Sequence, residues 1–179
     1  MERVCVKLNM LGVQYHLTGG VVSFFFGEPR MTQDLDIVIK LPPGKVAPLI
    51  AALQGEFYLD EEEVRKSLTG TRCFQALDND TFVKVDFHVG EEIPGELDRS
   101  RRLRFLGTFE VPCVSKEDAI LSKLLWIKKG SHKSRADVAA MLKDPVRIDR
   151  VYLLAKASEL GVRDLLAELE SESREQERD

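Results

Sequence analysis

Three aspartates occupy positions from which their carboxylates could together hold a divalent cation. Asp34 and Asp36 are two residues apart in the alternating stretch 34–41, so both side chains should project from one face of a strand, about 6–7 Å apart. Asp86 lies mid-way along a second alternating stretch, 82–89, between apolar neighbours. Because burying a lone charge is costly, a shared cation would explain an aspartate there. Magnesium prefers oxygen ligands and usually combines carboxylates with substrate phosphates, so these aspartates predict a plausible site for magnesium or manganese.

A glycine pair precedes these carboxylates. Gly19-Gly20 ends an alternating stretch and stands thirteen residues before Asp34. Glycines there let the backbone approach a ligand closely, and the helix expected from Val21 would present its N-terminus, which favours phosphate. Ser23, one turn into that helix, is a candidate hydroxyl donor to a phosphate, or a hydroxyl that faces its own helix.

Each of these features has an ordinary structural explanation when taken alone. The pair Asp34 and Asp36 could be a solvated strand edge, Asp86 could form an ion pair with a nearby lysine, and Gly19-Gly20 could be a tight turn. Their combination, together with Arg30 and Thr32, favours a metal or nucleotide site.

Three further residues extend this site, each with two interpretations. Arg30 either contacts phosphate or braces Asp34 through a bidentate pair. Thr32 is assigned to the nucleotide-binding set, although it is better suited to fixing the turn before the strand than to chemistry. His88 shares a strand face with Asp86, where it is either structural or a base beside the metal.

The elements that must position these residues follow from hydrophobic periodicity. The pattern predicts helices at 2–11 and 45–55 and a short helical turn at 21–26. It predicts strands at 13–18, 34–41 and 82–89, with further strands and turns over the rest of 56–90. A further strand run covers 103–114. After Ser115, which begins a capping-box pattern, we expect helices at 116–129, 134–142, 147–160 and from 163 onward. This order predicts an α+β fold, with a catalytic α/β core at 1–115 and a C-terminal helical part at 116–179.

Composition limits the classes of protein that fit. The 179 residues carry a formal net charge of −4, which argues against a dedicated nucleic-acid coat. Most of the excess acid lies in 164–179, so the remainder could still bind an anion. Three cysteines without a CxxC pair fit a reducing cytoplasm, and the absence of a long apolar run predicts no membrane span.

The combined motif resembles a known family. Gly19-Gly20, Asp34-Leu-Asp36 and Asp86 are similar to the signature of the polymerase-β nucleotidyltransferase superfamily. The wider stretch 17–37, Leu-Thr-Gly-Gly through Asp-Leu-Asp-Ile, is similar to small bacterial and archaeal members related to the toxins of type IV toxin–antitoxin systems. The resemblance covers roughly residues 12–142.

The resemblance implies a mixed β-sheet flanked by helices, in which Asp34, Asp36 and Asp86 bind magnesium and the glycine turn contacts the triphosphate. It also implies that Lys123, within Glu117-Asp-Ala-Ile-Leu-Ser-Lys123, points toward the nucleotide. The chain departs from the family at 135–138, which reads Arg-Ala-Asp-Val where an Arg-Asp step is frequent.

The expected activity is therefore transfer of a nucleoside monophosphate from a nucleoside triphosphate to a hydroxyl acceptor, with pyrophosphate released. The acceptor could be RNA, a protein or a small molecule, and a toxin role with an antitoxin partner follows from the resemblance alone. The alternative is a catalytically silent module that binds nucleotide or a partner. The sequence leaves the oligomeric state open.

Overall fold

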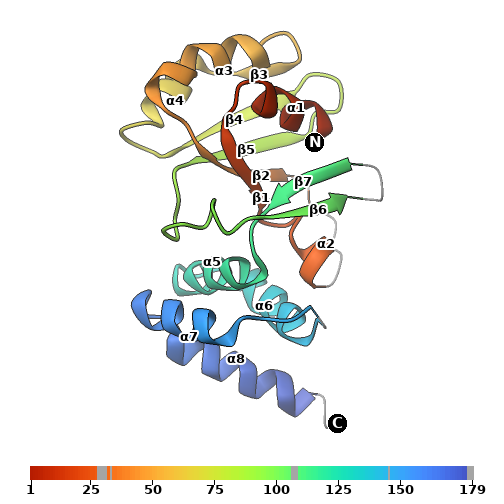
Figure 1. Ribbon diagram of the computed structural model, residues 1–179, viewed down its shortest axis with the longest axis vertical. Helices are drawn as coiled ribbons and strands as arrows, with labels where there is room; N and C mark the ends of the chain where they lie inside the picture. The colour runs from red at the N-terminus through yellow and green to blue at the C-terminus, as the bar shows by residue number, and fades with distance from the viewer. Residues whose placement is uncertain (28–31, 33, 106–108, 145, 177–179) are drawn as a thin grey trace. The chain divides into compact units, whose positions relative to one another are not determined.

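The computed structural model describes residues 1–27, 32, 34–105, 109–144 and 146–176 (Figure 1). Its contacts divide the chain into two compact units, which are described separately. The first comprises Met1–Val21 and Met31–Val114, and the second comprises Val22–Arg30 and Ser115–Asp179. The assignment of a catalytic core to 1–115 and a helical part to 116–179 stays a prediction.

A seven-stranded mixed sheet forms the first unit, with the spatial order β3-β4-β5-β2-β1-β7-β6. The strands are β1 (Gln14–Thr18), β2 (Asp34–Lys40), β3 (Phe57–Leu59), β4 (Cys73–Asp78), β5 (Lys84–Val89), β6 (Arg101–Phe105) and β7 (Phe109–Cys113). The pairs β2–β5 and β1–β7 are parallel, and the other neighbours are antiparallel. The predicted α+β class with a mixed sheet is confirmed.

The two faces of this sheet differ in character because successive side chains along a strand point to opposite sides. One face, the core face, is apolar: Leu35 and Ile37 of β2 and Val85 and Phe87 of β5 are all buried. The other, the polar face, carries the side chains that alternate with them on the same strands. The alternation predicted for β2 and β5 is confirmed, and it separates the core from the candidate site.

Three helices supply the buried side chains that complete this core: α1 (Glu2–Met10), α3 (Val46–Leu53), which follows the 3-10 turn η1 (Pro43–Lys45), and α4 (Glu61–Lys66). Helix α4 corrects the prediction that 56–90 holds only strands and turns. Its start is fixed by Asp60, whose carboxylate accepts hydrogen bonds from the backbone N–H groups of Glu62 and Glu63. An N-cap of this kind outweighs the weak periodicity of a six-residue helix.

The turn between β4 and β5 is held by one buried carboxylate. Asp78 Oδ1 accepts the backbone N–H groups of Asp80 and Thr81, each at 3.0 Å, and the Arg3 guanidinium of α1 at 2.6 Å. Burial alone would raise the pKa of Asp78, but these hydrogen bonds outweigh it and lower the pKa to about 2. The turn ends at Phe82, which has a φ of 56° and so lies outside β5, where the sequence placed it.

Asp78→Asn should therefore reduce the free energy of unfolding at pH 7 by about 2 kcal/mol, because the ionised carboxylate is stabilised in the folded state. The pKa of Asp78 is lower in the folded protein than its ordinary 3.8, so this contribution is present above pH 4 and is lost as the pH falls toward 2. Urea titrations of both proteins between pH 7 and pH 2.5 should show the difference shrinking with acidification.

Asp98→Asn is the matched control, since it removes an exposed carboxylate that accepts one hydrogen bond from the Gln14 amide. Its stability should stay within about 0.5 kcal/mol of wild type across the same pH range. A loss for Asp78→Asn that is equally large at pH 7 and pH 2.5 would contradict the assignment.

The second unit is helical. It contains the short α2 (Ser23–Phe26) and the helices α5 (Lys116–Lys128), α6 (Lys133–Lys143), α7 (Arg150–Glu159) and α8 (Arg163–Gln176), close to the predicted ranges. The predicted N-cap is confirmed, because Ser115 Oγ accepts the Asp118 backbone N–H at 3.1 Å. Asp118 in turn accepts the Tyr152 hydroxyl at 2.6 Å, which joins α5 to α7. Within the described ranges, no helix is both long and apolar enough to cross a bilayer.

Candidate active site

The three predicted carboxylates lie on the polar face of two neighbouring strands. Asp36 of β2 is in register with Asp86 of β5, and Asp34 is in register with Lys84. Because paired residues in a ladder project to the same side, the carboxylates of Asp34, Asp36 and Asp86 share one patch of the sheet. The structure thus brings together aspartates that are far apart in sequence.

Carboxylates at neighbouring strand positions repel one another unless cations compensate them. Two side chains of the same face do so here. Lys84 Nζ lies 3.1 Å from Asp86 Oδ2 and 3.5 Å from Asp34 Oδ1, and His88 Nε2 lies 3.2 Å from Asp36 Oδ1.

The shifted pKa values of Lys84 and His88 follow from these contacts. The hydrogen bond to Asp86 raises the pKa of Lys84, and the hydrogen bond to Asp36 raises the pKa of His88 against the opposing effect of burial. Lys84 was not assigned to the site from sequence, and His88 was weighed there only as an alternative to a structural role. The signal was present, however, because Lys84 and His88 alternate with Asp86 along one strand.

The glycine turn lies directly against these carboxylates. Gly19 has a φ of 67°, and a Cβ built on it would lie 1.9 Å from Asp36 Oδ2. A Cβ on Gly20 would lie 2.8 Å from Thr32 Oγ1. Thr32 donates to the Asp34 carbonyl at 3.0 Å, which is the turn-fixing arrangement expected of it. Absence of side chains at both glycines thus allows Asp36 and Thr32 to take these positions.

The donor chemistry of this patch fits magnesium. All three candidate ligands are carboxylates, and Asp86 Oδ1 is a buried oxygen that accepts no hydrogen bond within the described part of the chain. Among the described residues, no group of three or more His, Cys, Asp or Glu side chains is arranged closely enough to hold a metal ion. The Lys84 ammonium lies between Asp34 and Asp86, so a divalent ion there would have to displace it.

A comparison with known protein families gives a match over most of the chain. Residues 10–178 match the family described as "Nucleotidyl transferase AbiEii toxin, Type IV TA system". The chain belongs to this family. The AbiEii match confirms the resemblance seen in the glycine and aspartate motifs and extends it through the C-terminal helices. No curated protein matches this AbiEii-family chain by sequence.

Solved structures share its fold. A solution structure of the antibiotic-resistance factor ANT(2'')-Ia aligns with a TM-score of 0.57 at 14% identity, covering 99% of this chain and 92% of that one. An antigenic nucleotidyltransferase-like protein from Paracoccidioides brasiliensis aligns with a TM-score of 0.55 at 19% identity, covering 93% and 88%. The lincomycin-bound lincosamide adenylyltransferase LnuA aligns with a TM-score of 0.50 at 15% identity, covering 76% and 90%. At these identities the likeness shows that the AbiEii-family chain has a nucleotidyltransferase fold.

The remaining predicted site residues do not belong to the described part of the first unit. Ser23 and Lys123 belong to the second unit, and Arg30 lies outside the described residues. Ser23 Oγ is buried without a hydrogen-bond partner among the described residues. Lys123 is buried on α5, where its Nζ lies 2.5 Å from Asp137 Oδ2 on α6. Their predicted contacts with nucleotide, and those of Gly19, Gly20 and Thr32, stay predictions.

Lys123→Met should lower the free energy of unfolding by about 3 kcal/mol, because it leaves the buried Asp137 carboxylate without this cation. The double variant Lys123→Met/Asp137→Leu should recover about half of that loss, since it removes both charges. Denaturant titration measures both effects. A single variant as stable as wild type would contradict the structural importance of the pair.

The double variant also separates the two roles of Lys123. If Lys123 contacts phosphate, the double variant should regain stability and still bind nucleoside triphosphate more weakly than wild type. If the pair is only structural, nucleotide affinity should recover together with stability.

Proposed function

We propose that this protein is a magnesium-dependent nucleotidyltransferase that moves a nucleoside monophosphate from a nucleoside triphosphate to a hydroxyl acceptor. One observation carries the proposal: Asp34, Asp36 and Asp86 share a patch of one sheet face, with the backbone of Gly19 against Asp36. The family match and the fold support nucleotidyl transfer in general.

In this proposal the carboxylates bind metal and accept a proton, and the glycine turn binds the triphosphate. Asp34, Asp36 and Asp86 would hold magnesium, which when bound neutralises phosphate charge and orients the reacting groups. Asp86 accepts the proton of the acceptor hydroxyl as its oxygen attacks the α-phosphorus. The bond from that phosphorus to the bridging oxygen breaks, and pyrophosphate leaves. Gly19, Gly20, Ser23, Arg30 and Thr32 bind the triphosphate in this proposal, and Lys123 stabilises charge on it.

Lys84 and His88 have a place in this scheme. With no divalent ion bound, Lys84 offsets part of the negative charge of Asp34 and Asp86, and His88 lies within hydrogen-bonding distance of Asp36. The same contacts favour a second candidate function, a silent nucleotide- or partner-binding module, because Lys84 already pairs with two of the three carboxylates. Release of pyrophosphate distinguishes the two.

The biological setting follows the family and is part of the proposal. We place the reaction in the cytoplasm, where Cys5, Cys73 and Cys113 would remain free thiols, as they are in the structure. A toxin role, restrained by an antitoxin partner, is what the AbiEii description suggests.

Thermal denaturation tests the proposal most directly. Wild type and Asp36→Ala are melted with each of the four ribonucleoside triphosphates, with and without magnesium. We expect at least one triphosphate to raise the midpoint by about 5 °C or more, only with magnesium and only in wild type. No rise with any triphosphate would reject nucleotide binding. A rise without pyrophosphate release across a panel of RNA, protein and small-molecule acceptors would favour the silent module.

A further inference from the structure

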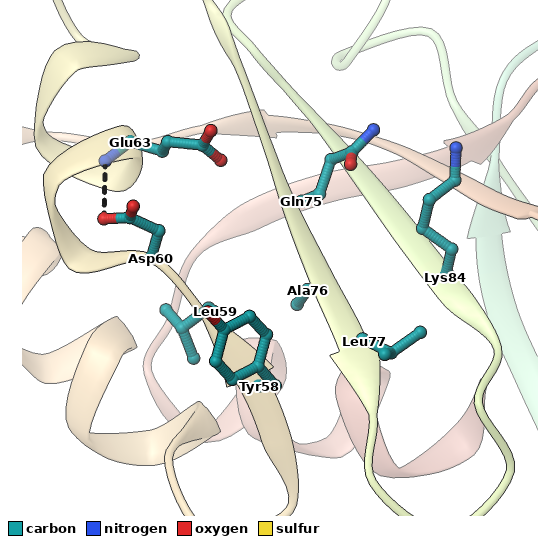
Figure 2. A pocket seen from close by; sticks show the side chains of 8 residues that line it. All are labelled: Tyr58, Leu59, Asp60, Glu63, Gln75, Ala76, Leu77 and Lys84. Carbon is teal, nitrogen blue, oxygen red and sulfur yellow. Dashed lines mark hydrogen bonds between the residues drawn. The ribbon is translucent and has the colours of Figure 1, made fainter.

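A pocket of about 410 Å³ opens beside the carboxylates, within the first unit (Figure 2). Its floor comes from β3, β4 and β5, and its wall from the first turn of α4. Its lining residues are Tyr58, Leu59, Asp60, Glu63, Gln75, Ala76, Leu77 and Lys84. Clefts of 300–1,000 Å³ are typical of small-molecule sites.

The strand register joins this pocket to the site. Gln75 of β4 is directly paired with Asp86, and Leu77 is paired with both Tyr58 and Lys84. Since paired residues project to one side of a sheet, the pocket floor continues the polar face. Lys84 belongs to both, because it lines the pocket and contacts Asp34 and Asp86. A ligand lying over Gln75 would place a hydroxyl beside Asp86, the carboxylate that is proposed to accept the proton of that hydroxyl.

The charge of the pocket is acidic. Lys84 is already shared between two aspartates, so its charge is compensated. On the α4 wall the Asp60 carboxylate is engaged as the helix N-cap, since it accepts the backbone N–H groups of Glu62 and Glu63. The Glu63 carboxylate forms no ion pair with any described residue, whereas Glu62 pairs with Lys66 at 2.7 Å. Figure 2 shows the polar ends of Glu63, Gln75 and Lys84 spread along one side of the pocket, from α4 across to the strand that carries Lys84. Phosphate groups would be repelled here, and ammonium groups would be attracted.

The other half of the pocket is apolar and open. The Tyr58 side chain is 71% exposed, next to Leu77, so its ring is available as a flat surface. Such a ring binds the apolar face of a sugar or stacks beneath a cation. The pocket thus presents an aromatic surface on one side and unpaired acid on the other.

We propose that this pocket binds the acceptor of the transfer reaction, and that the acceptor is a small molecule carrying both amine and hydroxyl groups. This inference rests on the proposed function for the chemistry that follows binding. Glu63 recognises the amine, Tyr58 supports the ring, and Gln75 holds a hydroxyl next to Asp86. RNA, with its phosphates, is disfavoured by the same charges.

The test uses three β-1,4-linked disaccharides that differ only in the substituent at C2: diglucosamine with amines, its di-N-acetyl form with acetamides, and cellobiose with hydroxyls. Their affinities for wild type, Glu63→Gln and Tyr58→Ala are measured by calorimetry, without nucleotide or metal. We expect the diamine to bind wild type about tenfold more tightly than the two neutral sugars, and Glu63→Gln to remove that preference. Tyr58→Ala should weaken all three. Amide resonances of Glu63 and Gln75 should shift on binding.

Glu62→Gln is the matched control, because it removes a neighbouring carboxylate of the same helix that does not line the pocket. It should leave the affinity of the diamine within twofold. Equal affinity for charged and neutral sugars, or equal effects of Glu62→Gln and Glu63→Gln, would overturn the proposal. Binding of pentauridylate that Tyr58→Ala abolishes would also overturn it and assign the pocket to RNA.

Binding and transfer separate the two proposals. If the diamine binds through Glu63 but no triphosphate binds with magnesium, the proposed function fails and the acceptor assignment fails with it, while the amine pocket remains. If a triphosphate binds and the diamine does not, only the acceptor inference fails. If both bind, labelled nucleotide should be transferred to the diamine, and Glu63→Gln should raise its KM without changing the Kd of the triphosphate.

Discussion

Asp36→Asn should reduce nucleotidyl transfer by about a thousandfold and abolish the magnesium-dependent stabilisation by triphosphate. Asp36 is in register with Asp86, so it stands at the centre of the carboxylate patch. Asparagine keeps the shape of the side chain and removes the negative charge that a divalent ion requires. The transfer rate is measured by pyrophosphate release with the acceptor found active for wild type.

A second readout shows whether the substitution acts locally. In wild type the hydrogen bond to Asp36 raises the pKa of His88, against the effect of burial. Asp36→Asn should therefore lower the pKa of His88, and a titration of its imidazole resonances by NMR measures the change. The free energy of unfolding without metal should change by about 1 kcal/mol or less, because the loss of the His88 contact is offset by reduced repulsion from Asp86.

Asp98→Asn again provides the control, since it removes a carboxylate from an exposed position away from the patch. It should retain the wild-type transfer rate. If Asp36→Asn kept a tenth or more of wild-type activity, Asp36 could not be a metal ligand in the reaction.

Gly19→Ala should strongly reduce activity, although it removes no functional group. A Cβ at Gly19 would lie 1.9 Å from Asp36 Oδ2 and 2.5 Å from its Cγ. These atoms cannot overlap, so the carboxylate must leave its place beside Asp86. We expect transfer to fall by about a hundredfold or more, with a matching loss of magnesium affinity measured by calorimetry with manganese as the probe.

Gly12→Ala is the control for backbone strain. Gly12 has a φ of 59°, close to the 67° of Gly19, but a Cβ added to it meets nothing within 4 Å. Both variants should lose about 1–2 kcal/mol of stability, because alanine is strained in the left-handed region. Only Gly19→Ala should lose activity. Equal activity in the two variants would show that the Gly19 contact with Asp36 is unimportant.

Local features of the fold followed closely from the sequence. Alternation along 34–41 and 82–89 correctly assigned Asp34, Asp36 and Asp86 to polar strand positions, because side-chain direction repeats every two residues in any strand. Helix α4 was missed because only the Asp60 cap, and no long apolar stripe, marks it.

Long-range contacts depended on the tertiary structure. The sequence suggested that three carboxylates converge, but the parallel pairing of β2 with β5 and its register decide that Asp36 is the direct neighbour of Asp86. Register is set by how the apolar side chains of the core face pack together, and no local pattern contains that information. The same pairing aligns Asp34 with Lys84, so the fold shows that this lysine contacts Asp34 as well as Asp86.

The sequence by itself therefore determined which side chains are polar, which face of a strand they occupy, and to which family the motif is similar. The tertiary structure decided the contacts of those side chains: His88 contacts Asp36, and Lys123 pairs with Asp137. It also formed the pocket that Gln75 lines. The physical reason is that direction along a strand or helix is a local property of the backbone. Partners and cavities arise only when segments distant in the chain bury their apolar faces together.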